Sequence, residues 1–264
     1  MDVMRGSGSG GAGSIGGAGS IGGAGSIGNS SSSSSAYVVT PNPEIVWMAR
    51  TNKALQTAVN NAALVLPDAI GIIMAARILG TPIRGGRVPG IDFVSALFEK
   101  MAESGKSVFL LGAKPGVAEQ AGKNLVERYR GLVLAGSADG YFTDDGPVIA
   151  QINAVNPDLL LVCLGAPKQE LWMAENGEKL SARLCAGLGG SLDIFAGNVK
   201  RAPPVFCKLG LEWLYRLSQE PRRIKRMIKL PLFVLAVIWA RISVVCKKPR
   251  SGRAAKRGSD ATAK

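Results

Sequence analysis

Short apolar runs alternate with longer amphipathic stretches along the chain from residue 36 onward. The apolar runs have the length of buried strands, and each leads into a loop rich in Gly, Pro or Asp. This alternation predicts an α/β fold, with a mostly parallel sheet and helices on both of its faces. We expect the strands in the segments AYVVTPN, ALVLPDAIG, SVFLLGAKPG, GLVLAGSADGYF, PDLLLVCLGAPKQE and ARLCAGLGGSLDIFAG.

The amphipathic stretches predict the helices that cover this sheet. In sheets of this kind, ligands bind in the loops that follow the carboxyl ends of the strands, so candidate chemistry is sought there. We expect helices over Pro43–Ala63, from the Pro67-Asp68 turn through Arg77, and over Ile91–Ser104, Val117–Tyr129 and Pro147–Val155.

Composition divides the chain into four parts. Residues 1–35 are of low complexity, with GAGSIG repeated three times over 11–28, and we expect a disordered leader there. An α/β core is expected over 36–208, a helical and membrane-associating appendage over 209–246, and a disordered polybasic tail over 247–264.

The excess positive charge is confined to the C-terminal quarter. Residues 1–199 hold 15 Lys/Arg and 16 Asp/Glu, whereas residues 200–264 hold 17 and 3. A near-neutral body argues against a nucleic-acid binder, and a basic, apolar tail favours an anionic membrane surface. The apolar run at 230–240 is too short to span a bilayer, so it is either an interfacial segment or a core helix. If exposed, it would also favour self-association away from the membrane.

The chain has no histidine, which excludes Ser-His-Asp and Cys-His catalysis and removes the commonest metal ligand. Residues 1–35 lack the apolar segment of a secretory signal, so we expect a reducing, cytoplasmic setting. The four cysteines have no CxxC spacing and are expected to be small buried hydrophobes: Cys163, Cys185, Cys207 and Cys246.

Three strand-end loops combine glycine with polar side chains. LLGAKPGV, residues 110–117, is either a phosphate-binding turn or a plain strand-to-helix turn. In LGAPKQE, Lys168 and Gln169 are donors for a diphosphate, or the segment simply starts a helix. In GLGGSLDIFAG, Asp193 either accepts hydrogen bonds from a ribose or a base, or caps the next helix.

Asp68 is the candidate general base. Inverting transfer from a nucleotide-sugar needs one carboxylate to take a proton from the acceptor hydroxyl, because the leaving diphosphate is already a stable anion. The alternative is that Asp68 is a helix N-cap. Nothing singles out the second, paired carboxylate that a glycosidase requires.

Three arginines near the C-terminus are spaced by seven and three residues. On one continuous helix, Arg216, Arg223 and Arg226 would lie within an arc of about 80°. Pro221 weakens that assumption, because proline breaks or restarts a helix. The group either binds a diphosphate, whose oxygens match the guanidinium fork, or forms a solvated basic face.

Taken together, these segments resemble the WecG/TagA/CpsF family of bacterial glycosyltransferases (glycosyltransferase family 26). The resemblance covers about residues 37–227 in family order, and the combination of PKQE, RAP and EWLYRL–EP–R is highly specific. The matching segments are VVTPNPEIV, LVLPDAIG, VPGID, VFLLGAKPGV, GYF, LGAPKQE, GGSLDIFAG, KRAPP and GLEWLYRLSQEPRRIKR.

The resemblance implies a Rossmann-like core and inverting, metal-independent transfer from a UDP-sugar without any cofactor. The sugar would be N-acetylmannosamine or a related hexose or uronic acid. The acceptor would be a polyprenyl-diphosphate-linked sugar at the cytoplasmic face of the bacterial plasma membrane, where cell-surface polysaccharide or teichoic acid is made.

The resemblance also implies roles for particular residues. Four would form the reacting centre, with Asp68 as the base: Asp68, Thr40, Asn42 and Gln169. Four would bind the donor, the last two at the uridine: Gly112, Lys168, Tyr141 and Asp193. Three would hold the acceptor diphosphate: Arg216, Arg223 and Arg226.

One departure leaves a second hypothesis open. The family commonly has Gly after the Asp of its PD motif, and this chain has Ala69, which puts the local backbone in question. The alternative to an enzyme is therefore a catalytically idle, membrane-associated protein that binds a nucleotide-sugar.

Overall fold

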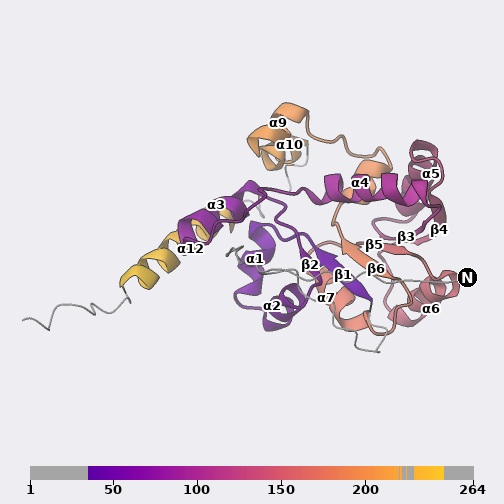
Figure 1. Cartoon of the computed structure of the whole chain (residues 1–264), viewed down its shortest axis with the longest axis horizontal. Coiled ribbons are helices and arrows are strands. Elements are labelled where there is room, and N and C mark those ends of the chain that lie inside the picture. The colour runs from indigo at the N-terminus through magenta and orange to yellow at the C-terminus, as the bar shows by residue number, and fades with distance from the viewer. Residues whose placement is uncertain (1–34, 220, 222–223, 225–228, 247–264) are drawn as a thin grey trace, which may run out of the picture. The chain divides into compact units, whose positions relative to one another are not determined.

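The computed structural model describes residues 35–219, 221, 224 and 229–246 (Figure 1). Six strands form one sheet in the order β2-β1-β6-β5-β3-β4, and all the pairings are parallel. The expected α/β fold and its six strands are confirmed. The strands are β1 (Ala36–Val39), β2 (Leu64–Val65), β3 (Ser107–Gly112), β4 (Val133–Ala138), β5 (Leu159–Cys163) and β6 (Leu184–Gly187).

The middle of the sheet is where the sequence is most continuously apolar. Every side chain of β5, which reads LLLVC, is buried, and β3 beside it is buried from Val108 to Gly112. Helices cover both faces of these strands, so neither face needs polar side chains. Cys163 and Cys185 are buried in this region as expected.

Two apolar clusters occupy the two faces of the sheet. Val108 and Leu110 of β3 belong to one cluster and Phe109 and Leu111 to the other, because successive side chains of a strand point to opposite faces. The first cluster includes α4, α5 and α8, and the second includes α6 and α7 (Figure 1). These helices are α4 (Gly90–Glu103), α5 (Val117–Arg128), α6 (Asp145–Val155), α7 (Lys168–Asn176) and α8 (Ser191–Phe195).

The single helix expected over residues 43–63 is wrong, because the chain forms two helices there, α1 (Pro43–Ala49) and α2 (Lys53–Asn60). Asn42 and Asn52 are their N-caps, and each side-chain oxygen accepts a hydrogen bond of 3.0 Å from the backbone N–H three residues later. A strong N-cap residue inside the stretch therefore starts a second helix.

The part of the appendage that the structure describes is helical, as expected. It comprises α10 (Glu212–Gln219) and α12 (Lys229–Cys246), and α9 (Pro204–Leu209) precedes it at the end of the expected core. Arg223 and Arg226 lie outside the described residues, so their expected arrangement with Arg216 stays a prediction. The leader over residues 1–34 and the polybasic tail over 247–264 also lie outside them.

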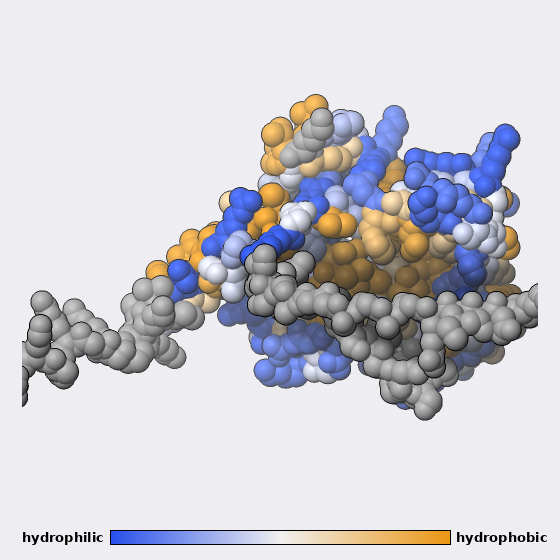
Figure 2. Space-filling view, in the orientation of Figure 1, coloured by the Kyte–Doolittle hydropathy of each residue, from blue (hydrophilic) through white to orange (hydrophobic). Residues whose placement is uncertain are grey.

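Helix α12 packs along α3 (Ile70–Leu79), as Figure 1 shows. Phe233 and Val237 are buried against α3, and Arg241 donates a hydrogen bond of 3.3 Å to the carbonyl of Leu79. Other apolar side chains of α12 face outward, including Leu235, which is 63% exposed, and Trp239, which is 73% exposed. Figure 2 shows hydrophobic surface along this helix and α3. One side of the segment 230–240 is therefore packed in the core, and its other side is exposed. Of the helices in the described part of the chain, none combines the length and hydropathy needed to cross a bilayer.

At the amino end of the sheet, Asp158 joins three segments. Its carboxylate accepts hydrogen bonds from the backbone and hydroxyl of Ser107 and from Lys106, and it pairs with Arg183. The Ser107 backbone N–H makes the largest contribution in lowering the pKa of Asp158 to about 2. A carboxylate with a lowered pKa stabilises the fold above its unfolded pKa, and this stabilisation is lost as the pH falls through the folded value.

We expect Asp158→Asn to lower the free energy of unfolding by about 1 kcal/mol at pH 7, after allowance for solvent screening. The deficit should shrink from pH 4 to pH 2, where the wild-type carboxylate becomes protonated. Urea unfolding at several pH values measures both effects. Glu103→Gln is the control, since Glu103 forms only an exposed pair with Lys100 and should change stability little. A deficit independent of pH would contradict the assignment.

Candidate active site

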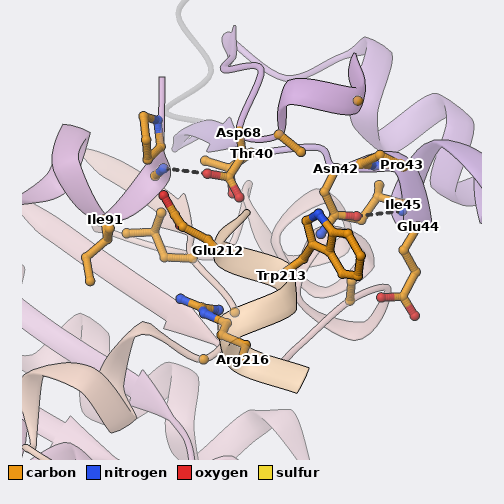
Figure 3. A pocket seen from close by; sticks show the side chains of 18 of the residues that line it. Thr40, Asn42, Pro43, Glu44, Ile45, Asp68, Ile91, Glu212, Trp213 and Arg216 are labelled. Carbon is orange, nitrogen blue, oxygen red and sulfur yellow. Dashed lines mark hydrogen bonds between the residues drawn. The ribbon is translucent and has the colours of Figure 1, made fainter. Parts of the chain in front are cut away.

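A cavity of about 410 Å³ lies at the carboxyl ends of β1, β2, β5 and β6 (Figure 3). Parallel strands end at the same edge of a sheet, so loops far apart in the sequence meet there. Helix α10 adds its side chains from the appendage. Five of the residues predicted from the sequence line this cavity: Thr40, Asn42, Asp68, Gln169 and Arg216.

Asp68 is not the N-cap of the helix that follows it, so that alternative is wrong. The N-cap of α3 is Ala69, without a side-chain hydrogen bond. The Asp68 carboxylate instead accepts a hydrogen bond of 3.0 Å from the backbone N–H of Gly90, at the start of α4. Ala69 has φ −114° and ψ 145°, an extended conformation that any residue adopts. Alanine in place of the family's usual glycine therefore causes no local strain.

Burial raises the pKa of Asp68 above its ordinary value. The Gly90 N–H opposes this shift, the Glu212 carboxylate adds to it, and the guanidinium groups of Arg87 and Arg216 oppose it. A carboxylate with a raised pKa is a stronger base than a solvated aspartate, yet it is still held in a defined position by Gly90.

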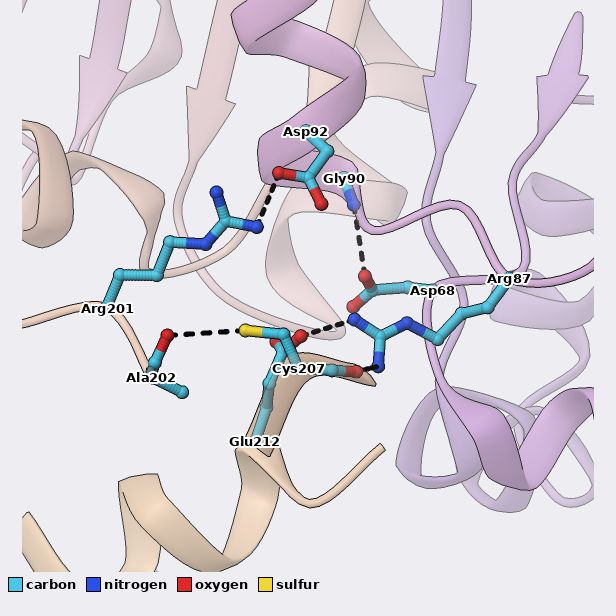
Figure 4. Close-up of polar contacts among 8 residues, drawn as sticks. All are labelled: Asp68, Arg87, Gly90, Asp92, Arg201, Ala202, Cys207 and Glu212. Carbon is cyan, nitrogen blue, oxygen red and sulfur yellow. Dashed lines mark hydrogen bonds and ion pairs between the residues drawn. The ribbon is translucent and has the colours of Figure 1, made fainter. Parts of the chain in front are cut away.

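An ion pair between Arg87 and Glu212 connects the α3–α4 loop to α10 (Figure 4). Arg87 also donates a hydrogen bond of 3.3 Å to the carbonyl of Cys207 in α9. Arg201 pairs with Asp92 of α4 in the same region. These contacts fix α9 and α10 against the core, and α10 thereby brings Arg216 to the cavity. Cys207 is partly exposed, which corrects the expectation that it is buried.

Thr40 and Asn42 have defined hydrogen-bond partners at the end of β1. The Thr40 hydroxyl donates to the carbonyl of Gly187 in β6 at 3.0 Å, and both groups are buried. The Asn42 oxygen caps α1, so its amide nitrogen is the part of the side chain left for a ligand. Both side chains therefore line the cavity and also fix the backbone segments that surround it.

Gln169 is 2% exposed and is held from two sides. Its oxygen accepts a hydrogen bond of 2.8 Å from the backbone N–H of Gly189, and its nitrogen donates one of 2.8 Å to Glu170. The Gly189 N–H can only donate, so it fixes the orientation of the amide. The second N–H of Gln169 is then available to a ligand in the cavity.

Glu170 is fully buried behind Gln169. One of its carboxyl oxygens accepts the hydrogen bond from Gln169, and the other has no hydrogen-bond partner among the described residues. Burial raises the pKa of this carboxyl, which favours the neutral acid.

The four predicted donor residues do not line the cavity. Lys168 is the first residue of α7, as the helix-start interpretation expects, and it donates to the carbonyl of Gly140 at 3.3 Å. Tyr141, the residue after Gly140, is 69% exposed. Gly112 approaches the backbone of Cys163 so closely that a Cβ would lie 2.4 Å from its carbonyl oxygen. Gly112, Tyr141 and Lys168 thus lie at or just after the ends of β3, β4 and β5, outside the lining of the cavity.

Asp193 lies in the first turn of α8 and is half-buried, and the N-cap of α8 is Gly190 rather than Asp193. The capping alternative for Asp193 is therefore wrong.

Several residues of the cavity were not singled out from the sequence. Glu212 and Trp213 precede Arg216 on α10, and the spacing of four between Glu212 and Arg216 could have indicated a shared face. Arg87 lies in the loop RGGRVPG, which has no periodicity. Its position directly before the VPGID segment of the family pattern was the only signal in the sequence that could have indicated it. Glu44 also lines the cavity.

The fold and the cavity define a class of protein. A parallel α/β sheet presents the partly buried carboxylate of Asp68 near two guanidinium groups at its carboxyl edge, which suits proton removal beside an anionic substrate. The chain belongs to the WecG/TagA/CpsF family of glycosyl transferases, whose family model matches residues 26–246.

Relatives in three species are similar over most of their length. An N-acetylglucosaminyldiphosphoundecaprenol N-acetyl-beta-D-mannosaminyltransferase of Bacillus spizizenii is 37% identical over 206 residues, 78% of this chain and 80% of that protein. The enzyme of the same name from Bacillus subtilis is 36% identical over 203 residues, covering 77% and 79%. The one from Staphylococcus aureus MRSA252 is 34% identical over 212 residues, covering 80% and 83%.

We expect Glu170→Gln to become more stable relative to the wild type as the pH rises from 5 to 8. A buried carboxyl with a raised pKa stabilises the fold at low pH, and this contribution is lost as the pH rises, because the unfolded chain ionises first. Glutamine keeps an oxygen for Gln169 and has no such dependence. Urea unfolding at both pH values measures the relative gain, which should be positive.

Glu170→Met is the matched comparison. It removes the acceptor for Gln169 and should be about 1–3 kcal/mol less stable than Glu170→Gln at either pH, because a buried N–H loses its partner and neither variant titrates. If the wild type and the Gln variant show the same pH dependence, Glu170 is not held neutral.

Proposed function

We propose that this glycosyltransferase moves N-acetylmannosamine, or a related hexose or uronic acid, from a UDP-sugar to a sugar on a polyprenyl diphosphate. The observation that carries the proposal is the partly buried carboxylate of Asp68, whose pKa is raised, in a cavity that also presents Arg87 and Arg216. The relatives' names supply the sugar and the acceptor, since they transfer N-acetylmannosamine to N-acetylglucosaminyldiphosphoundecaprenol. The pathway would be that of a cell-envelope polysaccharide or teichoic acid.

In this proposal Asp68 removes the proton from the acceptor hydroxyl as that oxygen attacks the anomeric carbon of the donor sugar. The bond from that carbon to the UDP oxygen breaks, and the diphosphate leaves with the electron pair. The raised pKa of Asp68 suits a base near neutral pH. The available N–H groups of Asn42 and Gln169 are donors for the hydroxyls of the reacting sugars.

The two substrates would enter from different sides. Gly112, Tyr141 and Lys168, at or just after the ends of β3, β4 and β5, would bind the donor, with Tyr141 at its uridine, and Asp193 would add a carboxylate for the ribose or base. Arg216 lines the cavity from α10 and would bind the acceptor diphosphate, together with Arg223 and Arg226 beyond the described residues. Lys168 and Gln169 are donors for the leaving diphosphate, so the proposal assigns no step to a metal ion or cofactor.

We further propose that the protein works at the cytoplasmic face of the bacterial plasma membrane. The acceptor of the relatives is a membrane lipid, and the outer side of α12 is apolar, with Trp239 exposed and the cations Lys229 and Arg241 on the same helix. Away from a membrane, the same surface would favour association between copies.

The direct test is a panel of UDP-sugars incubated with N-acetylglucosaminyl-diphosphate-farnesol and the purified full chain, in the presence of EDTA. We expect the product mass to rise by one N-acetylhexosamine with UDP-N-acetylmannosamine, because relatives use this sugar. Transfer of no sugar from any donor would favour the idle binding protein, whose one hint in the sequence was Ala69. Loss of transfer in EDTA would contradict the metal-independent mechanism.

We expect Asp68→Asn to lower kcat by at least about 100-fold, the contribution typical of a general base. UDP affinity and the urea midpoint should stay close to those of the wild type. The wild-type kcat should fall as the pH drops through the raised pKa of Asp68, because only the ionised form accepts a proton. Steady-state kinetics across pH measures this, with Glu103→Gln as the control carboxylate. Near-normal turnover of Asp68→Asn would remove Asp68 as the base.

A further inference from the structure

Part of the lining of the cavity is an apolar wall contributed by three helices. Leu230 and Val234 of α12 line it, and they are four residues apart, so they lie on the same face of that helix. Ile70, the first residue of α3, and Trp213 of α10 complete the wall. Asp68, Glu212 and Arg216 line the same cavity, so polar and apolar linings are continuous (Figure 3).

This wall is open to the outside. Ile70, Trp213 and Val234 are each about two-fifths to one-half exposed. Another apolar residue of the cavity lining, Ile45, is only 3% exposed. Nothing in the reaction of two sugars and a diphosphate needs an apolar surface of this kind. An apolar wall that runs from a charged centre to the surface fits a ligand with a charged head and a hydrocarbon tail.

We propose that Ile70, Trp213, Leu230 and Val234 bind the hydrocarbon chain of the acceptor next to its diphosphate and guide it out of the cavity. The proposal rests on the proposed function for the identity of the acceptor. The proposal assigns different roles to two sides of α12, which the continuous apolar sequence of that helix does not distinguish. Val234 faces the substrate cavity, whereas its neighbour Leu235 is 63% exposed and does not line the cavity.

The neighbouring residues Val234 and Leu235 provide a matched pair of substitutions. The probes are farnesyl diphosphate and ethyl diphosphate, which share the head group and differ in chain length. Binding is measured by calorimetry with the full chain in buffer without vesicles. We expect the wild type to bind farnesyl diphosphate at least about tenfold more tightly, as burial of several apolar carbons predicts. Val234→Asp should lose most of that preference, and Leu235→Asp should keep it.

A second variant distinguishes loss of binding from loss of folding. Val234→Trp stays apolar but fills the space along the wall, and it should weaken farnesyl diphosphate binding while ethyl diphosphate binding is unchanged. Urea midpoints of all variants check that α12 remains packed on α3. Equal losses in Val234→Asp and Leu235→Asp would mean general adsorption to α12 and would overturn the proposal. A dimer detected by sedimentation would also overturn the proposal, if Val234→Asp dissociated that dimer without changing farnesyl diphosphate binding.

Transfer assays separate this inference from the proposed function. If the wild type glycosylates acceptors with farnesyl and ethyl chains at equal kcat/KM, the lipid wall is refuted and the sugar transfer stands. If it glycosylates neither but binds farnesyl diphosphate through Val234, the transfer proposal fails and the wall stands.

Discussion

Parallel pairing of the strands is the constraint on which the site depends. A parallel sheet ends all of its strands at one edge, so β1, β2, β5 and β6 deliver their loops to the same place although they are spread over 150 residues of sequence. The close approach of β3 to β5 requires a glycine at the end of β3, and the hydrogen bond from Thr40 to Gly187 joins β1 to β6 just where the cavity begins. The positions of the polar groups follow from this register.

The second constraint is the balance of charge in a partly buried space. The carboxylates of Asp68, Glu44 and Glu212 all line one cavity. The guanidinium groups of Arg87 and Arg216 oppose the rise in the pKa of Asp68. The pairing of Arg87 with Glu212 leaves Asp68 without an ion-pair partner of its own among the described residues, with one backbone N–H as its hydrogen-bond donor. A direct arginine partner would lower the pKa of Asp68 and weaken it as a base.

The strands, the two-faced sheet and the central carboxylate could be predicted, because they depend on local patterns: apolar runs, turn residues and a Pro-Asp pair after a strand. The break at Asn52 was predictable in principle, since asparagine is a strong N-cap, but helical periodicity on either side concealed it. Gly90 as the partner of Asp68 and Arg87 as the partner of Glu212 were not predictable, because these contacts join residues 22 and 125 positions apart. Family resemblance identified residues such as Tyr141 and Asp193, but it carried no geometry, so their place outside the cavity emerged only from the structure.

Helix α3 begins one residue after Ala69, and therefore two after Asp68, and it ends at Leu79, where Arg241 holds its last carbonyl. Phe233 and Val237 of α12 are packed along the same helix. Helix α3 thus has Asp68 just before its first residue and the outermost helix of the appendage packed along its length. A shift of α12 relative to the sheet would therefore be passed along α3 to the loop that carries Asp68.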